Sequence, residues 1–256
     1  MVHDFLPRLV GPPLVEQVLA TGGRWYAPPP GQARIPLEFS HAAFRYGHSQ
    51  IRHTYRLVRG GPELPLFPDL VGFRPVPAGR RVDLALLFDL PGHPPAQRAK
   101  RIDGRLPSSL IALPEQITGA VDLPAHRSLA VRDLLRGELT GLPSGETVAR
   151  HLGVPPLPTH FRPHGTPLWS YILAEARHYG DGDRLGPVGG RIVAEVLIGL
   201  LRADPAEPGT GLAADPARRG TGLRAGRPAL PGPPPRLKAA RETRILRIRR
   251  ARTRPP

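Results

Sequence analysis

The sequence contains no cysteine, which excludes disulfide bonds, zinc–thiolate sites and iron–sulfur clusters. It also lacks any run approaching the roughly 20 apolar residues of a membrane-spanning helix, so we expect no membrane span. No secretory signal peptide is predicted, because the N-terminus has no basic region and Asp4, Arg8 and Glu16 interrupt its apolar run.

Aromatic residues are also few, at 5%, whereas the chain holds 35 Pro and 29 Gly in 256 residues. This composition lies at the edge of the low-complexity range. The net charge of +15 is unevenly distributed. Thirteen of the 36 basic residues but only three of the 21 acidic residues lie in 205–256, so this segment carries +10 of the net charge. We therefore predict a folded domain over 1–204 and a disordered basic Pro/Arg-rich tail over 205–256.

The longest amphipathic stretch runs from Ile35 to Leu57 and predicts one helix, ended by Gly60 and Gly61. Its apolar residues recur at spacings of three, four and seven, as on one helical face: Phe44, Ile51, Tyr55 and Val58. His48 falls on this face, and Arg45 precedes it by one turn. A histidine on an apolar face is more often a core residue than a ligand, and spacing alone does not decide between these roles.

Shorter apolar periodicities predict further helices joined by long loops. We expect one short helix in residues 1–34, loops with short helical turns in 62–104, two or three helices in 107–152 and two helices in 165–202. Ser128 is expected to cap the helix that follows it. The predicted fold class is therefore mainly α with long Pro/Gly-rich loops.

The string EFSHAAFRYGHSQIR resembles the proximal-histidine helix of the animal-type haem peroxidases, the family of myeloperoxidase, peroxinectin and their bacterial relatives. The family pattern, A-F-R-F/Y-G-H-S/T-x-I/V, is matched by residues 43–49 and by Ile51. The resemblance implies that His48 ligates the haem iron and that Gly47 lets the macrocycle approach the backbone. It also implies that Arg45 pairs with a haem propionate.

A second string, LAVRDLLRGELTGLPSG, is similar to the family pattern L-A-x-x-N-x-x-R-x-x-x-x-G-L-P. In the family, the Asn of this pattern accepts a hydrogen bond from the proximal histidine. Asp133 stands at that position, and a carboxylate is a stronger acceptor that would lower the reduction potential of the iron. The alternative for Asp133 is a solvated i, i+3 ion pair with Arg136. The resemblance instead implies that Arg136 lies near the propionate edge of haem.

Residues 165–204 look like the C-terminal helices of bacterial members. Together with the two strings above, they extend the resemblance over about residues 3–204. It implies the C-terminal portion of the animal haem-peroxidase helical fold, with haem as cofactor and with hydrogen peroxide and a small-molecule electron donor as partners. The family's distal His and Arg are not found in the chain, so no catalytic residue is assigned. We therefore expect a truncated peroxidase that is weak or inactive alone and needs a separate chain to supply the distal half.

Two other functions remain open at this point. One is a non-enzymatic or vestigial haem-binding fragment. The other is binding of nucleic acid or an anionic membrane through the charge of the basic tail. No specific nucleic-acid recognition is expected, because no stacking aromatic residues interleave the tail.

Overall fold

The computed structural model describes residues 1–72, 75–77, 79–158 and 165–204. Of these residues, 47% are helical and 4% are in strands, so the prediction of a mainly α protein is confirmed. The helices of the described ranges include none with the length and hydropathy needed to cross a membrane. The tail predicted over 205–256 lies outside the described residues.

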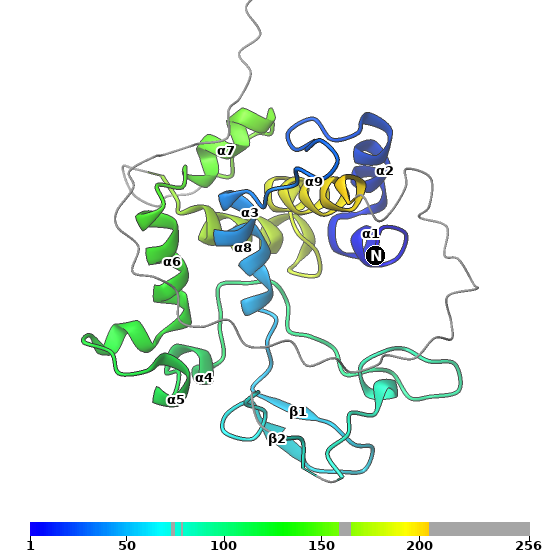
Figure 1. Cartoon of the computed structure of the whole chain (residues 1–256), viewed down its shortest axis with the longest axis vertical. Coiled ribbons are helices and arrows are strands. Elements are labelled where there is room, and N and C mark those ends of the chain that lie inside the picture. Colours follow the sequence, from blue (N-terminus) through cyan, green and yellow to red (C-terminus); the bar gives the residue numbers. More distant parts are fainter. Residues whose placement is uncertain (73–74, 78, 159–164, 205–256) are drawn as a thin grey trace, which may run out of the picture. The chain divides into compact units, whose positions relative to one another are not determined.

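The elements are labelled in Figure 1 and follow one another along the chain as α-helices, 3₁₀-helices (η) and two strands. In order, they are α1 (Phe5–Val10), α2 (Pro12–Thr21), α3 (Leu37–His41), η1 (Ala43–His48), β1 (Thr54–Arg56), β2 (Glu63–Pro65), η2 (Leu84–Leu86), α4 (Ser108–Ile111), α5 (Glu115–Thr118), η3 (Pro124–Arg127), α6 (Leu129–Leu139), α7 (Gly145–Leu152), α8 (Leu168–Gly180) and α9 (Pro187–Ala203).

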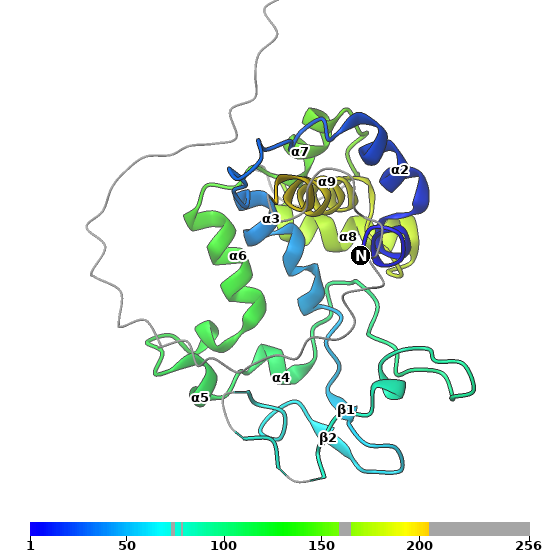
Figure 2. The ribbon, with the colours of Figure 1, turned by 45° about the vertical axis from the view of Figure 1, so that its right-hand side comes forward.

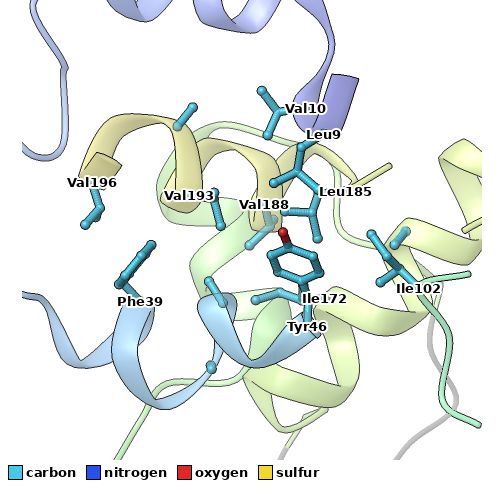
Figure 3. Close-up of a cluster of buried hydrophobic side chains, with 14 of the residues drawn as sticks. Leu9, Val10, Phe39, Tyr46, Ile102, Ile172, Leu185, Val188, Val193 and Val196 are labelled. Atoms are coloured by element: carbon cyan, nitrogen blue, oxygen red, sulfur yellow. The ribbon is translucent and has the colours of Figure 1, made fainter. Parts of the chain in front are cut away.

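The core is built around α9, which packs against α1, α2, α3, α7, α8 and η1. Figures 1 and 2 both show α9 among these helices. The close-up in Figure 3 shows side chains from several segments meeting on α9, among them Leu9, Tyr46, Ile172, Val188 and Val193. Burial of the Tyr46 ring raises the pKa of its hydroxyl to about 12. The η1 segment is therefore anchored in the main core.

The predicted single helix over residues 35–57 is wrong. The chain leaves α-helical geometry at Ala42, whose φ is −134° and ψ is −68°, and continues as the tighter helix η1. It then forms β1, where β-branched and aromatic residues favour extended backbone. Phe44, expected on a buried face, has 58% of its surface exposed.

A short antiparallel hairpin, β1 with β2, replaces the second half of the predicted helix. Thr54 pairs with Pro65, Tyr55 with Leu64, and Arg56 with Glu63. Gly60 lies in the connecting turn at a φ of +71°, a left-handed conformation that glycine adopts without steric cost. Gly60 and Gly61 are therefore turn residues and not the end of a helix.

The remaining helix predictions need two corrections. Residues 107–152, expected to hold two or three helices, contain the four α-helices α4 to α7 and the 3₁₀-helix η3. Residues 1–34 contain two helices, α1 and α2, because Gly11 separates them. As expected, Ser128 caps α6 by accepting a hydrogen bond from the Val131 amide. Pro187 occupies the first turn of α9. Proline is favoured there because the first helical amides have no acceptor within the helix.

The start of α9 is capped by a buried carboxylate from α8. Glu175 is fully buried and accepts hydrogen bonds from the Val188 and Gly189 amides at 2.9 and 3.0 Å. Burial raises the pKa of Glu175 to about 7, although the two amide donors oppose this change. The folded protein therefore binds a proton at Glu175 over a pH range in which the unfolded chain does not.

This proton linkage predicts that the stability falls as the pH rises. Below about pH 4.5 both states are protonated at Glu175. Between about pH 4.5 and 7 only the folded state is protonated at Glu175. The contribution of this proton to the stability is therefore lost as the pH rises through the folded pKa. The shift corresponds to roughly 3 kcal/mol. The free energy of unfolding, measured with urea between about pH 4.5 and 7, should fall with rising pH in wild type. In Glu175→Gln this part of the fall, roughly 3 kcal/mol, should be absent. The exposed Glu138→Gln serves as the control, and equal slopes for Glu175→Gln and wild type would contradict the prediction.

Candidate functional site

The centre of the candidate site is a contact between His48 on η1 and Asp133 on α6. His48 Nδ1 lies 2.6 Å from Asp133 Oδ2, and Arg45 Nη1 donates to Asp133 Oδ1 at 3.3 Å. Asp133 is 1% exposed, so both of its oxygens act in a nearly dry environment. The contact predicted between His48 and Asp133 is therefore present in the structure.

The 3₁₀ geometry of η1 explains why Arg45 and His48 reach the same carboxylate. In a 3₁₀-helix the side chains at i and i+3 eclipse one another. The line that contains Ala43, Tyr46 and Ser49 is buried in the core. The line that contains Arg45 and His48 is consequently turned toward α6, which runs beside η1 in both Figure 1 and Figure 2.

The third line of η1 holds Phe44 and Gly47 and is open. Phe44 is exposed, and its ring stacks on Phe39 with centroids 5.1 Å apart. A Cβ added to Gly47 would meet no heavy atom of the described chain within 4 Å. The backbone next to His48 therefore has space for an added side-chain carbon at Gly47.

Arg45 is held from two sides. Its guanidinium pairs with Asp133, and its carbonyl accepts a hydrogen bond from the Trp169 indole of α8 at 3.2 Å. Its Nε is buried and has no hydrogen-bond partner among the described residues. Arg45 is therefore the ion-pair partner of Asp133. This role was not predicted from the sequence, which predicted a contact of Arg45 with a haem propionate.

Arg136 is exposed on α6, and it does not pair with Asp133 among the contacts of the described residues. It lines an open hollow of about 560 Å³ together with His41, His126 and Arg132. Burial lowers the pKa of His41, and the charges of Arg136 and Arg45 lower it further. This side of the site is thus electropositive, which suits an anionic group.

Two residues near the site, His41 and Trp169, had no predicted site role. His41 lies in the same matched string as His48 and four residues before Arg45, so its position near the site could have been predicted from the sequence. The Trp169 indole contact spans 124 residues and has no local sequence signature. The four predicted residues Arg45, His48, Asp133 and Arg136 are brought to one region, three of them in direct contact.

In the described ranges, no group of three or more His, Asp or Glu residues could hold a metal ion. A haem iron needs only one protein ligand on its proximal side. No protein-family model matches the chain, and no curated protein matches it.

Proposed function

We propose that residues 1–204 form the proximal half of a domain of the animal-type haem-peroxidase fold, with His48 as the iron ligand. The observation that carries the proposal is the hydrogen bond between His48 and the buried Asp133. Ligating histidines in metalloproteins usually donate their second ring N–H to a carboxylate or carbonyl. Haem, when bound, would supply the oxidation of organic donors or halide by hydrogen peroxide.

Asp133 has two roles in this proposal. Because an ionised carboxylate only accepts hydrogen bonds, His48 donates from Nδ1, and its Nε2 carries the lone pair that a metal needs. The same bond fixes the orientation of the ring and raises the basicity of the imidazole. Arg45 neutralises the carboxylate from the other side, so the pair can remain buried.

The surroundings of His48 fit the proposed cofactor. The open line with Phe44 and Gly47 supplies a flat approach to the backbone. Arg136, whose side chain is exposed beside His41, is the better of the two arginines for a propionate, because Arg45 is already paired with Asp133. Haem would therefore be bound through one nitrogen and oriented through one exposed cation.

We assign no described residue to the distal side, where peroxidase chemistry needs a histidine and an arginine to handle the peroxide oxygens. The proposal is therefore that this chain binds haem and turns over hydrogen peroxide weakly or not at all by itself. A separate polypeptide would supply the distal half. The alternative is that the chain is a non-enzymatic haem-binding protein. In that case, addition of a polypeptide that carries the distal half would not produce peroxidase activity.

The test of the proposal is a haem titration followed by absorbance. Wild type should develop a Soret band at one haem per chain, whereas His48→Ala should lose it or shift it strongly, because the iron has lost its proximal ligand. Added imidazole should restore the band in His48→Ala beyond what haem and imidazole give without protein, and circular dichroism establishes that the variant is folded. The matched control is His53→Ala, an exposed histidine five residues away, which should behave as wild type. Equal uptake of haem by wild type and His48→Ala would refute the assignment.

A further inference from the structure

A second pocket lies beside the β-hairpin and shares no residue with the cluster around His48. It has a volume of about 290 Å³. Three arginines, Arg52, Arg56 and Arg59, contribute to its lining. Leu86, Pro94 and Pro95 contribute the main apolar part. The pocket therefore combines a cationic group of side chains with an apolar surface.

The charges in and around the pocket leave one cation uncompensated. Arg59 Nε lies 3.5 Å from Asp83, and Arg56 lies 3.8 Å from Glu63. Arg52 has no carboxylate within 4 Å in the part of the chain that the structure describes. Three arginines and two carboxylates give a net charge of one positive unit, which matches a ligand with one negative charge.

The pocket is held in shape by Gln97. Its side-chain oxygen accepts from the Arg56 amide at 2.9 Å, and its side-chain amide donates to the Arg56 carbonyl at 2.7 Å. Its own backbone amide donates to the Leu86 carbonyl at 2.8 Å. Gln97 thus ties the hairpin to η2, and a ligand meets a preorganised surface.

Arg52 is directed by its neighbours on the hairpin. Its backbone amide donates to the Tyr55 hydroxyl at 2.9 Å, and its guanidinium lies 5.8 Å from the Tyr55 ring centroid. Its Nη1 reaches the side-chain oxygen of Gln97 at 3.5 Å, a weak contact that leaves most of its donors for a ligand. A planar guanidinium of this kind binds a carboxylate through two parallel hydrogen bonds.

We propose that this pocket binds a small aromatic monocarboxylate, with its carboxylate on Arg52 and its ring against Leu86, Pro94 and Pro95. The single negative charge of the ligand balances the single excess charge of the pocket. The proline and leucine surface favours a flat apolar ring over a compact hydrated anion, because burial of apolar surface stabilises the complex. The site is independent of the proposed haem site and is tested without haem.

The test uses 4-fluorobenzoate as the probe, observed by ¹⁹F NMR with the full chain. Saturable binding is expected, weakened at least about tenfold in Arg52→Gln by loss of the charged hydrogen bonds. The uncharged 4-fluorobenzyl alcohol should bind more weakly than the carboxylate. The matched control is Arg8→Gln, an exposed arginine on α1, which removes the same charge from the same chain.

The basic segment 205–256 makes this control necessary, because non-specific attraction of anions would weaken equally in both variants. Equal affinities of wild type and Arg52→Gln would overturn the proposal, as would displacement of the probe by inorganic phosphate at the same concentrations as by benzoate. Circular dichroism establishes that Arg52→Gln is folded. If it is not folded, Arg52→Met replaces it, and an unchanged affinity in that variant overturns the proposal in the same way.

Discussion

Replacement of Asp133 by alanine should lower the free energy of unfolding by about 3–5 kcal/mol, the cost of leaving one member of a buried ion pair alone. Asp133 is 1% exposed, and its two oxygens serve Arg45 and His48. Without it, the Arg45 guanidinium would also lose its counter-charge, and its Nε already has no partner in the part of the chain that the structure describes. Urea unfolding followed by circular dichroism measures the loss.

The control on the same helix is Glu138→Ala, which removes an exposed carboxylate and should change the stability by less than about 0.5 kcal/mol. Asp133→Asn should be less damaging than Asp133→Ala, since the amide oxygen still accepts from His48. In a double-mutant cycle, Arg45→Met combined with Asp133→Ala should recover part of the loss. A fully additive cycle would show that the two residues are not coupled.

Gly145→Ala should lower the free energy of unfolding by about 3 kcal/mol, at the upper end of the usual cost of overpacking. A Cβ at this position would lie 1.9 Å from Cγ of Tyr171. Tyr171 is fully buried, and its hydroxyl accepts from the Leu157 amide at 2.9 Å, so its ring cannot move away without loss of that bond. The backbone of α7 must shift instead. Thermal or urea unfolding measures the difference.

Gly137→Ala in α6 is the matched comparison for Gly145→Ala. Its Cβ would meet only Leu142 Cδ1, at an ordinary van der Waals distance of 3.6 Å. Alanine is favoured over glycine inside a helix, so this variant should gain about 0.5–1 kcal/mol. If the two substitutions had the same effect, the contact between Gly145 and Tyr171 would not be the cause.

The elements that could be predicted from the sequence are those with a local signal. Ser128 as a cap, Pro187 in a first turn and the apolar spacing of α8 and α9 are all readable over a few residues. The mainly α class follows from these elements. The contact between His48 and Asp133 spans 85 residues, and its prediction came from two matched strings and not from periodicity.

The prediction failed between residues 35 and 57, where one helical period was assumed throughout. Within η1 and at the residue that follows it, the buried residues Ala43, Tyr46 and Ser49 have the three-residue period of a 3₁₀-helix. Tyr55 lies in strand β1 and pairs with Leu64 of strand β2. Packing of Tyr46 against α9 decides the local geometry, and such tertiary contacts have no representation in a single-sequence hydropathy pattern.

The 85 residues between His48 and Asp133 also determine the order in which the protein can be assembled. The imidazole acquires its acceptor only after the intervening chain has closed and α6 lies against η1, and closure of such a long loop costs entropy before any contact repays it. A cofactor that met the nascent chain early would find a freely rotating histidine. In the proposed haem site, the oriented His48 would therefore be a product of late folding, and the affinity for haem would report the completion of the fold.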